Sequence, residues 1–168
     1  MEDFKKISEI KLNEDNTATI KYTLINQDSN QEIKFDGVEK ITDEFRIAFK
    51  NTSNTIGEII EPFRNEKIKP QKITFDNKKN TVTYSFRYYP DDDLHPVCTI
   101  DTPKLPLLND EEPFPSKFYV SGLDVEILEN LKNFALSYIQ GETRTKQGKC
   151  VNTDPDGNIV IDFSNKEE

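Results

Sequence analysis

The amino-acid sequence predicts an α+β fold: a mainly antiparallel sheet with a C-terminal amphipathic helix and a short helical region packed on one face. Two observations lead to this prediction. Several short segments alternate between apolar and polar residues, which is the period of a half-buried strand, and turn-forming clusters separate them. Two other segments place apolar residues at helical spacing. One domain is expected for 168 residues; we assign residues 1–163 to it and residues 164–168 to a flexible acidic tail.

Three strands are expected in the first part of the chain. The first runs from Ile7 to Leu12 and ends at the turn-forming cluster 13–16. Residues 17–26 alternate between apolar and polar side chains over their whole length. A third strand at 33–37 completes a meander, one face of which is expected to be exposed to solvent.

The apolar period then becomes helical. Thr42 is suited to cap a helix, and Asp43 and Glu44 follow in its first turn, where the helix dipole favours acidic residues. We expect the polar cluster 51–54 to end this helix. A short second helix is expected through residues 56–60.

The second part of the chain repeats the order of hairpin and helix. Further strands are expected at 73–75, 82–88, 97–100, 143–151 and 159–161. Six of the nine prolines lie between residues 90 and 115, which predicts an irregular excursion from the sheet there. The final helix spans roughly 123–140, and Gly141 supplies its C-terminal stop.

Composition is typical of a very polar protein with an aromatic-rich core. The hydrophobic fraction is 34% and the charged fraction 32%, and eleven Phe and six Tyr supply apolar area. No segment approaches the roughly 20 apolar residues of a membrane span. The first residues contain no secretory signal, so we expect a cytoplasmic protein. Cys98 and Cys150 are expected to be free thiols, with Cys98 buried in its strand.

Negative charge is concentrated in two stretches of the chain. Residues 88–114 carry seven acids against one base, and residues 150–168 carry five acids against one base, within a total formal charge of −9. An acidic protein is repelled by phosphate over most of its surface, which makes direct binding of nucleic acid unlikely. The same charge favours a partner with a basic surface. The alternative interpretation is that the charge only maintains solubility.

Catalytic motifs are not found. His95 is the only histidine, no G-x-S-x-G motif accompanies it, and Cys98 would point away from it along the same extended segment. One histidine and two distant cysteines do not supply a zinc site, and no phosphate-binding glycine motif is present. Residues 152–159 resemble part of an EF-hand loop, but Phe163 stands where the bidentate Glu is required, so a β-turn is favoured. We assign no catalytic residue, metal ligand or cofactor.

The remaining candidate is a recognition surface in which aromatic residues border acidic ones. Such borders are typical of interface anchors. The predicted partner-binding residues are Tyr88, Tyr89, Asp91, Asp92, Asp93, Glu111, Glu112 and Phe114. The alternative is that these aromatic side chains cover the edge of the sheet as ordinary core.

The chain resembles a group of small uncharacterised phage or prophage proteins of low-GC Gram-positive bacteria. The resemblance rests on the N-terminal meander, on residues 43–49 (DEFRIAF), on residues 99–106 (TIDTPKLP) and on the terminal amphipathic helix. It spans about residues 5–140. The resemblance implies a phage setting and no particular activity.

Two functions are compatible with these patterns. The favoured hypothesis is a non-enzymatic, phage-type accessory or anti-defence protein that engages a host or phage protein through its acidic, aromatic-bordered loop. The alternative is a clamp-like or oligomeric accessory factor of DNA replication or recombination, in which the basic run 144–149 faces nucleic acid. Such a run is more often a solvated strand face. An enzyme would have to use a metal held by carboxylates.

Overall fold

The structure, a computed structural model, describes residues 4–59, 67–90, 98–107, 120, 122–141, 152–153 and 159–160. Several features expected from the sequence lie outside the described residues: the acidic groups at 91–93 and 110–112, His95, Phe114, the basic run 144–149, the turn at 154–157 and the tail at 164–168.

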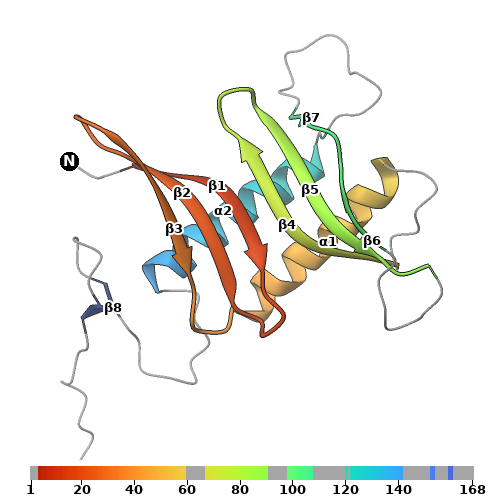
Figure 1. Ribbon diagram of the computed structural model, residues 1–168, viewed down its shortest axis with the longest axis horizontal. Helices are drawn as coiled ribbons and strands as arrows, with labels where there is room; N and C mark the ends of the chain where they lie inside the picture. Colours follow the sequence, from red (N-terminus) through yellow and green to blue (C-terminus); the bar gives the residue numbers. More distant parts are fainter. Residues whose placement is uncertain are drawn as a thin grey trace, which may run out of the picture.

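A seven-stranded antiparallel sheet forms one layer of the protein and two helices form the other, which confirms the α+β fold (Figure 1). The strands are β1 (Phe4–Leu12), β2 (Ala18–Ile25), β3 (Asn30–Asp36), β4 (Ile68–Asp76), β5 (Thr81–Tyr88), β6 (Cys98–Asp101) and β7 (Leu105–Pro106). They lie in the order β3-β2-β1-β4-β5-β6, and β7 pairs with β5. Helices α1 (Asp43–Ile59) and α2 (Leu123–Gln140) cover one face, behind the sheet in Figure 1.

The sheet contains two halves with a similar order of elements: three strands precede α1, and four strands, of which β7 is only two residues long, precede α2. β1 and β4 pair at the centre, where Ile10 lies opposite Ile73. Each of these strands has a bulge two residues before that pair, between Ile7 and Glu9 in β1 and between Pro70 and Lys72 in β4. A bulge adds one residue and shifts the alternation of faces. For this reason Ile7 and Ile10 are both buried although they are three residues apart.

Helix α1 begins where the sequence predicts and continues further. The Phe45 N–H donates to Thr42 Oγ1 at 3.3 Å, so Thr42 caps the helix as expected. The predicted break at 51–54 is wrong, because α1 runs without interruption to Ile59. Thr52 is buried in the expected break and its hydroxyl donates to the Phe49 carbonyl at 2.7 Å, so the polar group is satisfied inside the helix.

Aromatic side chains join the two helices to the sheet. The rings of Phe45 on α1 and Phe134 on α2 stack with centroids 5.7 Å apart, and Phe35 on β3 meets Tyr138 on α2 edge to face at 5.8 Å. Gly37 lies directly against Tyr138, since a Cβ at this position would stand 2.1 Å from the phenol oxygen. Tyr138 itself is fully buried. The aromatic-rich core expected from composition is therefore present.

Other sequence predictions were confirmed in part. Gly141 ends α2 in the left-handed conformation with φ 85°. The C-terminal hairpin pairs β8 (Asn152–Thr153) with β9 (Ile159–Val160). β8 lies just after the first predicted arm, 143–151, and β9 lies within the second, 159–161. Cys98 was expected to be buried and is exposed, because it begins the short strand β6 that pairs only with β5 in the described part of the sheet. Neither α1 nor α2 is long and apolar enough to cross a membrane.

Candidate functional site

A cleft of about 710 Å³ opens beside the bulge of β4. Its walls come from three parts of the chain: the turn between β1 and β2, the first turns of α1, and the neighbouring ends of β4 and β5. The buried side chains of Phe49, Ile68 and Pro70 contribute an apolar base. Clefts of this volume are within the range that binds small molecules.

The lining of this cleft is strongly basic. The five basic residues are Arg46, Lys50, Lys67, Lys69 and Arg87. Glu14 is the one acidic residue among those that line it. Field lines from like charges add inside a concave surface, so the cleft concentrates positive potential. It is therefore suited to bind an anion.

Three of the five basic groups have partners of their own. Arg46 pairs with Asp43 at 3.0 Å, and Arg87 pairs with Glu14 at 3.2 Å. Glu14 and the nearby Tyr89 hydroxyl raise the pKa of Arg87 further above its ordinary value. Lys67 Nζ donates to the Pro90 carbonyl.

The other two cations have no partner among the residues that the structure describes. Lys50 and Lys69 are exposed and make no hydrogen bond or ion pair with any residue that the structure describes. Lysine ammonium groups carry three donors each, which suits the oxygens of a phosphate.

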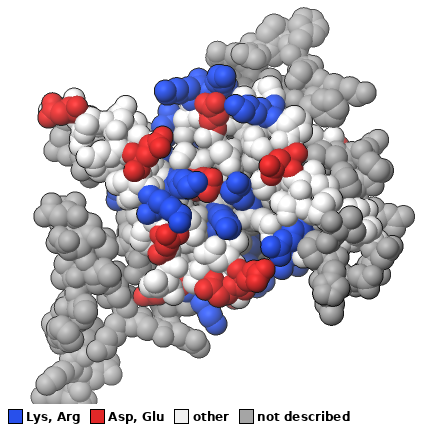
Figure 2. Space-filling view, viewed as in Figure 1, with Lys and Arg blue, Asp and Glu red and all other residues white. Residues whose placement is uncertain are grey.

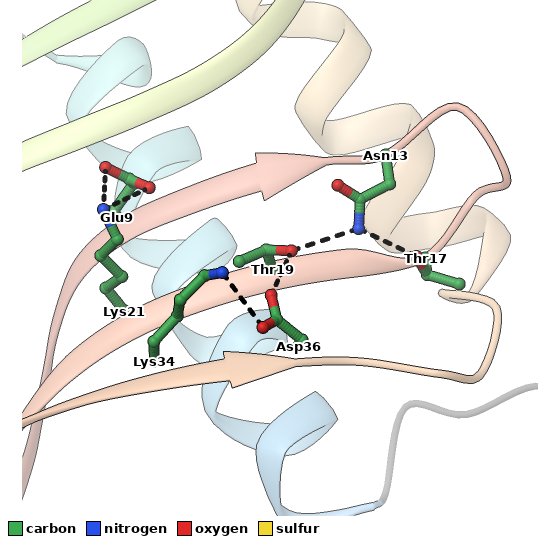
Figure 3. A network of polar contacts seen from close by, with 7 residues as sticks. All are labelled: Glu9, Asn13, Thr17, Thr19, Lys21, Lys34 and Asp36. Atoms are coloured by element: carbon green, nitrogen blue, oxygen red, sulfur yellow. Dashed lines mark hydrogen bonds and ion pairs between the residues drawn. The ribbon is translucent and has the colours of Figure 1, made fainter.

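The turn that forms one wall is held by short-range polar contacts. Asn13 Nδ2 donates to Thr17 Oγ1 at 2.9 Å and to Thr19 Oγ1 at 3.2 Å (Figure 3). The hydroxyl and the N–H of Thr17 donate to Asp15, which lowers the pKa of that carboxyl below 3.8. Asn16 takes the left-handed conformation with φ 64°. These contacts fix the wall that presents Glu14.

A second hollow at the equivalent bulge of β1 differs in charge. It has a volume of about 400 Å³ and contains two lysines, Lys21 and Lys34, together with two acids, Glu9 and Glu32. Lys21 and Glu9 pair at 3.2 Å (Figure 3). The two halves of the fold thus place a hollow at each bulge, and only the β4 hollow has excess positive charge. The charge of the cleft is a property of its residues and does not follow from the fold.

The structure places two of the eight predicted partner-binding residues. Tyr89 lines the basic cleft, and its N–H donates to the Lys67 carbonyl at 2.9 Å. Tyr88 is partly buried and packs against the core, as the alternative interpretation held. The remaining six, Asp91, Asp92, Asp93, Glu111, Glu112 and Phe114, lie outside the described residues.

Sequence reasoning did not find the basic residues of the cleft, because they are distributed over 42 positions of the chain. One signal was available: residues 67–90 carry six basic residues against one acid, Asp76. Among the residues that the structure describes, no three His, Cys, Asp or Glu side chains lie together as metal ligands would. Comparison of the chain with protein-family models, curated proteins and solved structures found no match.

Proposed function

We propose that this is a non-enzymatic binding protein that captures a phosphate-bearing ligand in its basic cleft. The observation that carries the proposal is the grouping of five basic side chains against one acid around a single cleft. Lys50 and Lys69 supply unpaired charge, and the paired Arg46 and Arg87 supply donors whose orientation is fixed. Charge-assisted hydrogen bonds from such groups are the strong ones in anion recognition.

The setting that fits this activity is the one the resemblance suggests, a cytoplasmic accessory or anti-defence protein of phage type. A protein of this kind acts by holding its ligand or partner and needs no catalytic group. Tyr89 adds an aromatic wall to the cleft, which suits a ligand with both phosphate and a flat ring.

Calorimetric titration with inorganic pyrophosphate tests this function. Wild-type protein should bind it, and Lys50→Ala/Lys69→Ala should weaken binding by about 30-fold to 900-fold, since each of the two charged hydrogen bonds contributes about 1–2 kcal/mol. Lys78→Ala/Lys79→Ala is the matched control, because it removes the same charge from the exposed β4–β5 turn outside the cleft. Equal weakening in both variants, or no binding by wild type, would remove the proposal.

Charge segregation favours a second proposal, docking of the acidic segments on a basic partner. The described residues carry 16 Lys and Arg against 15 Asp and Glu, whereas the rest of the chain carries 6 against 16. Acids on a balanced body steer a basic partner toward themselves. Replacing Asp91, Asp92 and Asp93 with Ser should weaken capture of such a partner and reduce its salt dependence. Unchanged affinity would exclude this docking.

The repeated halves favour the clamp-like alternative, because clamps are assembled from repeated sheet-and-helix units. That alternative predicts a stable higher oligomer. Multi-angle light scattering measures the mass directly, and a monomer at micromolar concentration would contradict a ring.

A further inference from the structure

The face of the sheet opposite the helices, called here the open face, carries basic side chains on each strand from β3 to β5, arranged diagonally and bordered by the acids Glu9, Asp36 and Asp101. The register of the strands places these residues on neighbouring strands from β3 to β5: Lys34, Lys21, Lys11, Lys72, Arg87 and Lys69, together called the basic band. Figure 2 shows Lys and Arg running across the middle of this face, with acidic residues between them.

Three pairs within the basic band bring like charges directly opposite each other. Lys21 faces Lys34 across β2 and β3, and Lys11 faces Lys72 across the central β1–β4 ladder. Lys69 faces Arg87 across β4 and β5. Like charges at opposed positions destabilise a sheet. Lys21, Lys34 and Arg87 each pair with an acid of the protein, so the repulsion that remains is greatest between Lys11 and Lys72, and an anion that bridges these two lysines would reduce it.

Half of the basic band is neutralised within the protein and half is not. Lys21 pairs with Glu9 at 3.2 Å, Lys34 with Asp36 at 3.1 Å and Arg87 with Glu14 at 3.2 Å. The other three, Lys11, Lys69 and Lys72, make no ion pair or hydrogen bond with the described residues. Lys11 and Lys72 lie at the centre of the sheet, so charge without an ion-pair partner is concentrated there, and Lys11 lowers the pKa of Asp36 at longer range.

We infer that the open face binds the sugar-phosphate backbone of a nucleic acid along the basic band. Four inter-strand steps of about 4.8 Å give the band a length of about 19 Å. A nucleic-acid strand places a phosphate every 3.4 Å or so along a duplex but winds around the helix axis, so about two or three phosphates face that length.

The residues beside the basic band also suit phosphate. Thr23, Thr74, Thr83 and Thr99 occupy the same face in the register of β2, β4, β5 and β6. Hydroxyls of this type are common phosphate ligands in nucleic-acid complexes. The basic band contains no aromatic side chain on which a base could stack, so the predicted binding is independent of base sequence. An acidic protein surface fits less well, because the basic band offers no apolar anchor for one.

This inference deepens the proposed function and shares Lys69 and Arg87 with the cleft. Its test therefore uses Lys11→Ala/Lys72→Ala, whose residues lie in the basic band and do not line the cleft. The control is again Lys78→Ala/Lys79→Ala. Circular dichroism verifies that both variants are folded, which is expected because Lys11 is exposed and Lys72 is only partly buried.

Fluorescence anisotropy with a labelled 30-nucleotide single strand and the matching duplex, between 50 and 200 mM salt, provides the readout. Both should bind without sequence preference. Lys11→Ala/Lys72→Ala should lower affinity about tenfold and reduce the slope of log K against log salt by about 1.4–1.8, whereas the control should leave the slope near that of wild type. The single strand and the duplex each test binding of the same sugar-phosphate backbone.

Three outcomes would overturn the inference: no binding of either form by wild type at 50 mM salt, equal loss in the two variants, or competition by polyglutamate of equal charge as strong as by the oligonucleotide. The last would assign the basic band to an acidic protein. Pyrophosphate titration of Lys11→Ala/Lys72→Ala separates the two proposals. In that variant, retained pyrophosphate binding with weakened oligonucleotide binding would support both proposals. Wild-type protein that binds pyrophosphate and no oligonucleotide would leave the cleft standing and remove the basic band.

Discussion

Gly37→Ala tests the packing that fixes α2 on the sheet. The new Cβ would stand 2.1 Å from the Tyr138 phenol oxygen and 2.5 and 2.6 Å from two ring carbons. Tyr138 cannot move aside at low cost, because it is fully buried and packs edge to face on both Phe35 and Phe45. Its hydroxyl donates to the Glu39 carbonyl and accepts from the Ala18 N–H at 3.5 Å.

The magnitude follows from these contacts. Overpacking of a core costs about 1–3 kcal/mol, and displacement of the ring would add about 1 kcal/mol for the hydroxyl bonds. We expect Gly37→Ala to lower the free energy of unfolding by about 2–4 kcal/mol, measured by urea denaturation with an unchanged m-value. In the Gly37→Ala background, Tyr138→Phe removes the shortest contact and leaves the two ring contacts, so it should recover part of the loss. A loss below about 0.5 kcal/mol in Gly37→Ala would refute the packing described here.

Three further predictions concern stability and ionisation. Thr55→Val removes the 2.7 Å hydrogen bond from buried Thr55 on α1 to Asp124 on α2 and should lower the unfolding free energy by about 1–3 kcal/mol in urea; an unchanged midpoint would contradict it. Hydrogen bonds lower the pKa of Asp15, Asp36 and Asp76 below 3.8 in the folded protein, so the stability they contribute is present above that value and is lost as pH falls below it. The urea concentration at the midpoint of unfolding should therefore decrease as the pH falls below 4, and the decrease should be less steep in Asp36→Asn. Identical pH profiles of the two proteins would count against the assignment. Burial, and then the charge of Asp124, raise the pKa of Tyr84 far above 10. Tyrosine absorbance titrations of wild type and Tyr84→Phe should therefore coincide until the protein unfolds at alkaline pH. A smaller change in absorbance in the variant before that point would show that Tyr84 is accessible.

The sequence predicted those elements whose pattern is local. The alternation over residues 17–26 became β2, and the apolar stripe over 123–140 became α2 with Gly141 at its end. The cap at Thr42 was also predictable, because it depends on residue types within one turn.

Errors arose where tertiary contacts satisfied polar groups that look helix-breaking in isolation. Thr52 bonds to a carbonyl of its own helix and Thr55 bonds to α2, so the polar stretch 51–54 stays helical. The bulges were also not predicted. The unequal spacing of the apolar residues Ile7, Ile10 and Leu12 reflects the bulge of β1 and was the signal that could have indicated it.

The basic cleft could not be predicted because its residues become neighbours only through long-range pairing. The pairing of β4 with β5 brings Lys69 opposite Arg87, and the packing of α1 beside β4 adds Lys50. The overall negative charge suggested a basic partner, whereas the cleft is suited to an anion. The net charge of −9 belongs largely to segments outside the described body, and the body itself carries one more base than acid. Total charge is therefore a poor guide to what a particular face of this protein binds.

Amine-specific acetylation, followed by mass spectrometry with and without inorganic pyrophosphate, measures directly whether the cleft holds an anion. The account predicts that pyrophosphate protects Lys50 and Lys69 and leaves Lys78 and Lys79 as reactive as before. Equal reactivity of Lys50 and Lys69 in the presence and absence of saturating pyrophosphate would contradict it.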